Sequence, residues 1–134
     1  MGANDIEHLP YKGESPQDRL AYQRYLADIK RGKSLLQLKA VAREMTPDIR
    51  QSWSARSFTV VSTPEGDFDA VVCNISYHFN KHGSKYGSIR VMTQEAKRYF
   101  QQYRQQATPN GFGLLKLPNG SLFELDGRIV TYTG

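Results

Sequence analysis

Two dipeptides near the C-terminus, Asn119-Gly120 and Asp126-Gly127, place the strongest limit on how this chain can fold. They are the residue pairs best suited to two-residue hairpin turns, because both central positions of such a turn need positive φ. They separate three short apolar segments, which are FGLLKLP (112–118), SLFEL (121–125) and RIVTYT (128–133). We therefore expect the C-terminus to form a three-stranded antiparallel meander joined by two-residue turns.

The first part of the chain carries helix signals instead. Ser15 is a suitable N-cap, Pro16 a suitable first helical residue, and Asp18 can complete a capping box. Apolar residues then recur at helical spacing until Gly32, at Tyr22, Tyr25, Leu26 and Ile29. A second helix is predicted to begin at Ser34 and to be interrupted at Thr46-Pro47, with a further turn containing Ile49 and Trp53.

Strand signals begin after Trp53. The segment 57–62 (SFTVVS) is rich in β-branched residues, and the turn-forming segment TPEGD separates it from 68–74 (FDAVVCN), so the two should pair as a hairpin. A helix capped by Thr93 should follow, with an apolar face and an opposite face that carries Lys97, Arg98, Gln101 and Arg104. The predicted class is α+β: helices first, then a small twisted antiparallel sheet with a helix packed on it.

Length and charge limit the possible functions. At 134 residues the chain suits a single domain, which we divide into a flexible tail (1–14), a helical part (15–53) and a sheet-containing part (57–134). Its 18 basic and 13 acidic residues give a net charge of +5, which favours a polyanionic partner without identifying one. Cys73 has no partner for an internal disulfide and is expected to be a small core residue. No segment reaches the roughly 18 to 20 apolar residues of a membrane span, so we expect no stable membrane insertion.

The segment HFNKHGSKYG (78–87) concentrates ionisable side chains. If residues 75–82 are helical, then Ile75, His78, Phe79 and His82 share one stripe, Ile75 and Phe79 anchor it, and Gly83 ends it. Both histidines could equally make ordinary hydrogen bonds at a helix end, and Lys81 and Lys85 could be solvated charges. The His-x-x-x-His spacing also suits zinc, but it lacks the glutamate of a metalloprotease and a third-ligand cluster, so we predict no metal or other cofactor.

A family resemblance rests on HFNKHGSKYGSIRVMTQEAKRYF (78–100) and GLLKLPNGSLFELDGRIVTYTG (113–134). These segments resemble the C-terminal toxin domains of contact-dependent growth inhibition and polymorphic toxin systems, specifically the barnase/EndoU/colicin/RelE-like ribonucleases. The resemblance implies metal-independent cleavage of RNA, often transfer RNA, leaving a 2′,3′-cyclic phosphate. It further implies a cognate immunity protein, in some cases a host activating factor, delivery as the C-terminal part of a larger toxin, and action in the cytoplasm of a target bacterium.

Site residues follow from the same resemblance. It implies that His82 is the acid or base, that Lys81 or Lys85 stabilises charge, and that Tyr86 contributes nearby. Thr131 and Tyr132 match the family's Thr-Tyr position in the last strand, where the resemblance implies a hydroxyl that positions the phosphate and an aromatic ring that stacks on a base or donates a proton.

Three assignments stay open on the residues alone. Arg128 could clamp a phosphate or be a surface charge, and His78 could be a second catalytic group or a packing partner. Strand alternation puts Arg128 and Tyr132 on one face and Thr131 on the other, unless a bulge intervenes. A non-catalytic RNA-binding module and an interaction protein are the alternative functions.

Overall fold

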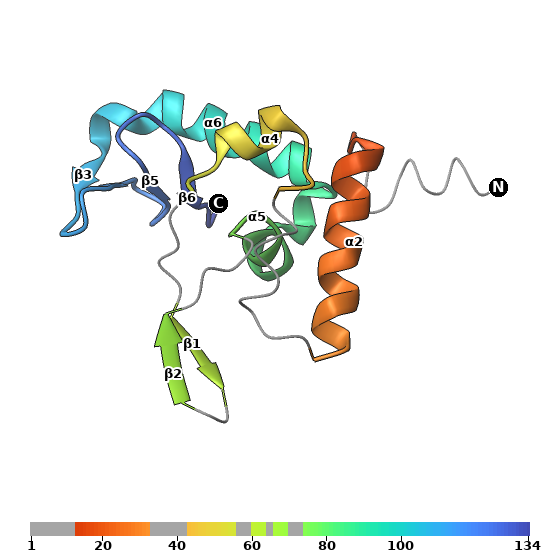
Figure 1. Cartoon of the computed structure of the whole chain (residues 1–134). Helices are drawn as coiled ribbons and strands as arrows, with labels where there is room; N and C mark the ends of the chain where they lie inside the picture. Colours follow the sequence, from red (N-terminus) through yellow and green to blue (C-terminus); the bar gives the residue numbers. More distant parts are fainter. Residues whose placement is uncertain (1–12, 33–42, 56–59, 64–65, 70–73) are drawn as a thin grey trace.

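The computed structural model describes residues 13–32, 43–55, 60–63, 66–69 and 74–134. The described helices α2 (Pro16–Lys30) and α4 (Pro47–Ser52) come first, followed by the hairpin strands β1 (Val60–Thr63) and β2 (Gly66–Asp69). Next come α5 (Asn74–His78), α6 (Ile89–Tyr103) and four short strands, β3 (Thr108–Pro109), β4 (Leu115–Lys116), β5 (Leu122–Phe123) and β6 (Ile129–Thr131). The last four strands form an antiparallel sheet in the order β3-β4-β5-β6, beside α6 (Figure 1). The predicted α+β class is confirmed.

Ser15 caps α2 as predicted, but through one half of a capping box, because the Asp18 carboxylate bonds the Ser15 hydroxyl. Ser15 Oγ accepts from the backbone N–H of Asp18 at 3.1 Å and donates to the Asp18 carboxylate at 2.7 Å. Asp18 is fully buried, and its carboxylate also accepts from the Thr46 backbone N–H at 2.7 Å and pairs with Arg90 at 3.3 Å. Because a buried charge needs partners, this one carboxylate holds α2, the start of α4 and the start of α6 together.

The predicted second helix, from Ser34, lies mostly outside the described residues. Thr46 is the N-cap of α4 and Pro47 its first residue, so the interruption predicted there begins a new helix that includes Ile49. The hairpin predicted after Trp53 is confirmed, with Val60 opposite Asp69 and Thr63 opposite Gly66. The predicted turn TPEGD was too long, because Thr63, Gly66 and Asp67 belong to the strands. Cys73 lies outside the described residues.

The C-terminal meander differs from the prediction in its turns. Leu117 and Ser121 are joined by a backbone hydrogen bond of 2.9 Å, and Glu124 and Arg128 by one of 2.8 Å, so each loop contains three residues. Gly120 and Gly127 have positive φ (89° and 95°). Among the described residues, positive φ occurs only at glycines. The two-residue turns were therefore wrong, because Asn119 and Asp126 remain at negative φ as in a type I turn that ends in a left-handed glycine.

A fourth strand, β3, was missed. The loop that joins β3 to β4 repeats the same geometry: Asn110 N–H donates to the Leu114 carbonyl at 2.9 Å, and Gly113 has a φ of 77°. The Asn110 side chain accepts from Phe112 N–H at 2.9 Å and from Leu114 N–H at 3.0 Å. Strand β3 has two residues, one of them a proline, so it gives no periodicity signal. Only the turn-forming residues Asn110 to Gly113 could have indicated a strand before them.

Helix α6 begins one turn earlier than predicted. Ser88 is the N-cap, and its Oγ accepts from Val91 N–H at 3.1 Å. Thr93 is not a cap: it is buried inside the helix, where its Oγ1 accepts a hydrogen bond of 2.9 Å from Trp53 Nε1. The polar face of α6 is as predicted, with Lys97, Arg98 and Gln101 exposed, and the exposed Arg104 follows as the C-cap of the helix.

Glu14 contradicts the predicted tail of residues 1–14. Its carboxylate accepts from the backbone N–H groups of Ile89 at 2.7 Å and Arg90 at 3.1 Å, at the N-terminus of α6. Free N–H groups and the helix dipole favour a carboxylate at this position. The remaining residues of the proposed tail, except Gly13, lie outside the described residues.

The main core lies between α6 and its neighbours. Phe100 of α6 packs on Phe123 of β5 with ring centroids 4.8 Å apart, while Ile89, Met92 and Ala96 are completely buried. Trp53 forms a bridge to Ile129, which fixes the chain leaving α4 beside β6. Helix α6 therefore has one flank beside α4 and contacts the segment after α5 as well.

Candidate active site

The histidine segment is only partly α-helical. Helix α5 ends at His78, and the chain continues as a π-helical turn, η1 (Phe79–Gly83), and a 3₁₀ turn, η2 (Ser84–Tyr86). A regular helix over 75–82 was therefore wrong beyond His78. The predicted anchors are confirmed, because Ile75 and Phe79 are each only 3% exposed. Gly83 ends the π-helical turn, and the wider turn leaves its Cα against the core.

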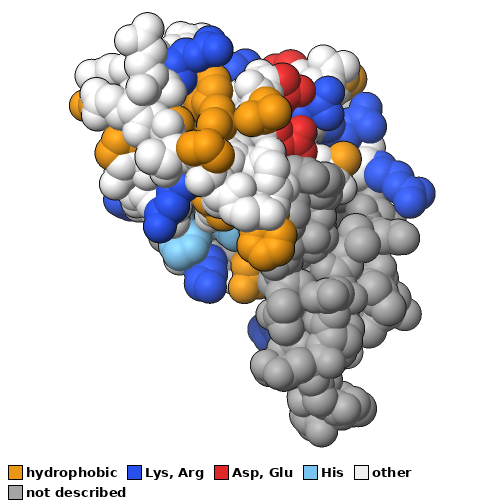
Figure 2. All heavy atoms as spheres, turned by 90° about the vertical axis from the view of Figure 1, so that its left-hand side faces the viewer, with side chains coloured by type: hydrophobic (Ala, Val, Ile, Leu, Met, Phe, Trp, Pro, Cys, Tyr) orange, Lys and Arg blue, Asp and Glu red, His pale blue; other side chains and the backbone are white. Residues whose placement is uncertain are grey.

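The two histidines lie side by side. Their rings are nearly parallel, with an interplanar angle of 13° and centroids 6.0 Å apart. His78 also meets the ring of Tyr77 edge-on at 5.1 Å, and its buried Nδ1 has no hydrogen-bond partner among the described residues. Figure 2 shows histidine side chains reaching the surface between lysine or arginine side chains.

Burial keeps both imidazoles neutral. It lowers the pKa of His78 from 6.5 to about 4, with smaller contributions from His82 and Lys81. Burial and the Lys81 charge also lower the pKa of His82, although part of the His82 side chain is exposed. At neutral pH His82 is therefore an accessible base with a free lone pair.

Two lysines and two tyrosines flank the histidine pair. Lys81 Nζ lies 5.8 Å from the centroid of the Tyr77 ring, and Lys85 Nζ lies 5.4 Å from that of the Tyr86 ring. Both lysines are exposed, and both rings are partly exposed. Cations and aromatic faces thus alternate over a short stretch of surface, an arrangement that suits phosphates and unstacked bases.

Tyr132 connects this segment with the last strand. Its ring lies 6.0 Å from that of Tyr86 and 5.9 Å from that of Tyr99, centroid to centroid. Burial, followed by a hydrogen bond with Tyr86, raises the pKa of Tyr132 well above the usual value of 10. Tyr132 therefore keeps its phenolic proton and acts as a hydrogen-bonding group, not as a base.

A bulge lies in β6 next to Tyr132. Leu122 pairs with Thr131 but Phe123 pairs with Ile129, so Val130 is an extra residue in the strand. The bulge interrupts simple alternation along the strand, which was the condition left open for Thr131. Thr131 is half-buried, and no described contact joins it to either histidine.

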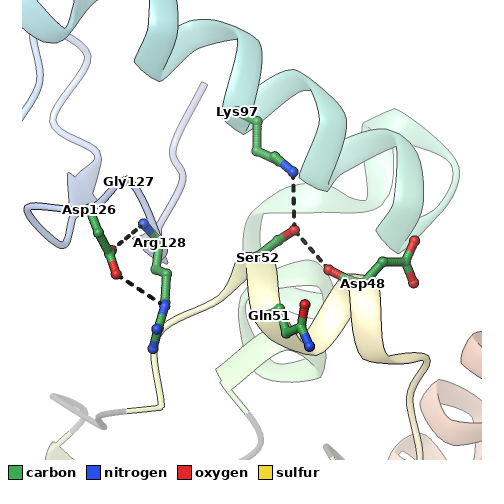
Figure 3. A pocket seen from close by; sticks show the side chains of 7 residues that line it. All are labelled: Asp48, Gln51, Ser52, Lys97, Asp126, Gly127 and Arg128. Atoms are coloured by element: carbon green, nitrogen blue, oxygen red, sulfur yellow. Dashed lines mark hydrogen bonds and ion pairs between the residues drawn. The ribbon is translucent and has the colours of Figure 1, made fainter.

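Arg128 lies in a different place from the histidines. Its Nε pairs with the Asp126 carboxylate at 3.2 Å, and its side chain lines a pocket with Ser52 of α4 and Lys97 of α6 (Figure 3). The described contacts join Arg128 to neither histidine. The structure thus brings His78, Lys81, His82, Lys85, Tyr86 and Tyr132 into one region and leaves Arg128 outside it.

Two site residues were missed from the sequence. Helical spacing places Tyr99 on the apolar face of its helix and gives no sign of a site role, yet its ring meets that of Tyr132 and its hydroxyl accepts from Asn119 N–H at 2.9 Å. Tyr77 carries no signal, because its place beside His78 and Lys81 depends on the π-helical turn. Only the shared spacing of Tyr99 and Tyr103 could have indicated an aromatic cluster there.

The chain matches no protein-family model, no curated protein and no solved structure. Within the described residues, no three histidine, cysteine, aspartate or glutamate side chains are grouped as metal ligands. Nor does any described helix have the length and apolar character needed to cross a membrane.

Proposed function

We propose that this chain is a metal-independent endoribonuclease, the toxic domain of a larger antibacterial protein, with His82 as its general base. One observation carries the proposal: a partly exposed imidazole, kept neutral by burial and by Lys81, lies between lysines and partly exposed tyrosine rings. This combination supplies a base, cations for a phosphate and surfaces for a base to stack on.

The reaction proceeds in one displacement. Neutral His82 takes the proton of a ribose 2′-hydroxyl, and the 2′-oxygen forms a bond to the adjacent phosphorus. The bond from phosphorus to the 5′-oxygen breaks, which leaves a 2′,3′-cyclic phosphate. Lys81 and Lys85 stabilise the negative charge that develops on the phosphorane oxygens.

The leaving 5′-oxygen needs a proton. Tyr132 is 6% exposed and hydrogen-bonded to Tyr86, whereas Tyr86 is only half-buried. We assign the Tyr86 hydroxyl as the group that gives this proton to the 5′-oxygen, and Tyr132, whose ring lies 6.0 Å from that of Tyr86, as the residue that orients it. Thr131 keeps its role as a hydroxyl near the phosphate on the resemblance alone, and His78 supports the ring of His82.

The biological setting follows the family resemblance. Transfer RNA is the proposed substrate, and a cognate immunity protein with acidic groups would cover the basic surface. The net charge of +5 supports both polyanionic RNA and an acidic inhibitor. Delivery into a competing bacterium, and activation there by a host factor, belong to the same proposal.

The test is incubation of the purified chain with total bacterial RNA, with and without EDTA and with and without an RNA-depleted bacterial extract. We expect cleavage that survives EDTA and leaves 2′,3′-cyclic phosphate ends. His82→Ala should lower the rate about 10²- to 10⁴-fold, the usual contribution of a general base. Gln105→Ala, at an exposed position outside the site, is the matched control. RNA that stays intact in all four conditions would refute the proposal, and RNA bound but intact would make the chain a binding module.

A further inference from the structure

A groove lined mainly by residues with charged, amide or hydroxyl side chains runs along the flank of α6 that faces α4. Two adjoining cavities of about 370 and 180 Å³ share Lys97, Asp126 and Gly127. We call their combined surface the α6 groove. Two carboxylates line it, Asp48 and Asp126, together with the side chains of Gln51, Ser52, Lys97, Gln101, Arg104 and Arg128. Figure 3 shows Lys97, Ser52 and Arg128 around the larger cavity, contributed by α6, α4 and the start of β6.

The α6 groove carries a surplus of positive charge. Its two carboxylates are neutralised by arginines, since Asp126 pairs with Arg128 at 3.2 Å and Asp48 with Arg90 at 2.7 Å. Lys97 contacts only the Ser52 hydroxyl, at 3.4 Å, in the described part of the chain. An anionic ligand could therefore bind Lys97 without first breaking an ion pair with a described carboxylate.

Arg104 is the second such cation. Its guanidinium lies 5.4 Å from the centroid of the Phe100 ring, and no described carboxylate pairs with it. Lys97 and Arg104 are seven residues apart, which is about 10 Å along an α-helix. Because phosphates follow one another about every 3.4 Å along a nucleic-acid strand axis, this distance suits several consecutive phosphates better than one.

The α6 groove lies on the other flank of α6 from the histidines. Tyr99 meets Tyr132 on the histidine side, and Lys97 is two residues earlier, which is a rotation of about 200° around the helix. A helix is about 10 to 12 Å across with its side chains. A ligand that reaches both places must therefore extend well beyond the nucleotides at the cleaved bond.

We propose that the α6 groove binds the phosphate backbone of the substrate RNA at a distance from the cleaved bond. The proposal rests on the proposed ribonuclease function. An acidic protein is disfavoured as the occupant, because the centre of a protein interface needs apolar anchors and the one aromatic ring here, Phe100, is buried and overlaid by Arg104. Serine and glutamine side chains beside lysine and arginine are instead the common partners of phosphate oxygens.

Charge reversal of the groove provides the test. Lys97→Glu and Arg104→Glu are compared with Arg98→Glu, which makes the same change in net charge on the same helix. Arg98 is exposed, lies outside the groove and pairs with Glu95 in a surface contact of small energetic value. Circular dichroism and urea unfolding show that each variant is folded.

Cleavage is measured on transfer RNA and on a dinucleotide. We expect each groove variant to raise KM for transfer RNA about tenfold, to leave kcat within about twofold, and to lower the slope of log KM against log salt by about one. The dinucleotide should be unaffected, because it is too short to reach the groove. Arg98→Glu should change KM for transfer RNA by less than about threefold.

Binding separates this inference from the proposed function. The same charge reversals are placed in the His82→Ala chain, and transfer RNA binding is followed by fluorescence anisotropy. Loss of affinity in the groove variants alone supports the inference even if the wild-type chain cuts no RNA. Equal losses for Arg98→Glu and the groove variants, or no loss in any of them, would overturn it. So would unchanged RNA affinity together with lost binding of an acidic immunity protein.

Discussion

Gly83 is the position where one added methyl group should do most damage next to the candidate site. A Cβ at this residue would lie 2.3 Å from the Met92 sulfur and 2.8 Å from Phe79 Cδ1. Neither neighbour can move away freely, since Met92 is 0% and Phe79 3% exposed. The backbone itself would accept alanine, because the φ of Gly83 is not positive. Overpacking of this kind costs about 1 to 3 kcal/mol.

Urea unfolding of Gly83→Ala measures this cost. With a urea m value of about 2 kcal/mol per M for a domain of this size, a loss of about 2 kcal/mol lowers the midpoint by about 1 M. Gly111→Ala is the matched control, because no heavy atom lies within 4 Å of its added Cβ and its φ is not positive. If the two variants unfold at the same urea concentration, the packing argument is refuted.

A second substitution tests the cause. Met92→Ala should by itself cost about 2 to 5 kcal/mol, because it leaves a cavity in the core. Combined with Gly83→Ala it should cost less than the sum of the two, by about 0.5 to 3 kcal/mol, since the added methyl group occupies part of that cavity. Additive losses would show that the methyl group and the sulfur do not compete for the same space.

Three further predictions concern protons and one buried hydrogen bond. Burial raises the pKa of Glu14 from 4.5 to about 7 despite its two backbone hydrogen bonds, so the folded state binds the proton more tightly. The stability that this proton contributes is complete below pH 4.5 and is lost as the pH rises to about 7. The difference in unfolding free energy between wild type and Glu14→Gln should therefore change between these two pH values and stay constant above pH 7. With His82 as base, the cleavage rate should rise with pH to a plateau and reach half its maximum below pH 6.5, and Lys81→Gln should move that midpoint upward; a wild-type midpoint above pH 7 would exclude this assignment. Trp53→Phe removes the donor to the buried Thr93 hydroxyl and should cost about 1 to 3 kcal/mol in thermal or urea unfolding, whereas an unchanged stability would mean that water replaces the indole N–H.

Local chemistry was sufficient to predict where α2 starts and where the meander turns. The Ser15 hydroxyl accepts from the Asp18 N–H and donates to the Asp18 carboxylate, so these two residues determine that helix start. At the turns the sequence located Gly120 and Gly127 correctly but not the loop length. Asn-Gly suits both a type I′ turn and a type I turn followed by a left-handed glycine, and the choice depends on how the flanking strands pair.

The start of α6 could not be predicted in the same way, because its capping group is distant in sequence. Ser88 and Thr93 are both acceptable N-caps on local grounds. Glu14 decides between them, since its carboxylate accepts the N–H groups of Ile89 and Arg90. Thr93 is then inside the helix, and the buried indole of Trp53 uses its hydroxyl.

In the candidate site, the residues at helical spacing could be placed from the sequence, whereas those in irregular turns could not. Helical spacing correctly placed the Ile75 and Phe79 anchors, because burial of an apolar side chain is what a periodic pattern records. The position of Tyr86 depends on a π-helical turn followed by a 3₁₀ turn, and neither has a periodic signature. Tyr86 nevertheless carries the contact between the histidine segment and Tyr132 in the last strand. Most residues of the site, though not Tyr77 and Tyr99, can thus be listed from sequence motifs. Their meeting depends on two irregular turns, in which Gly83 packs closely against Met92.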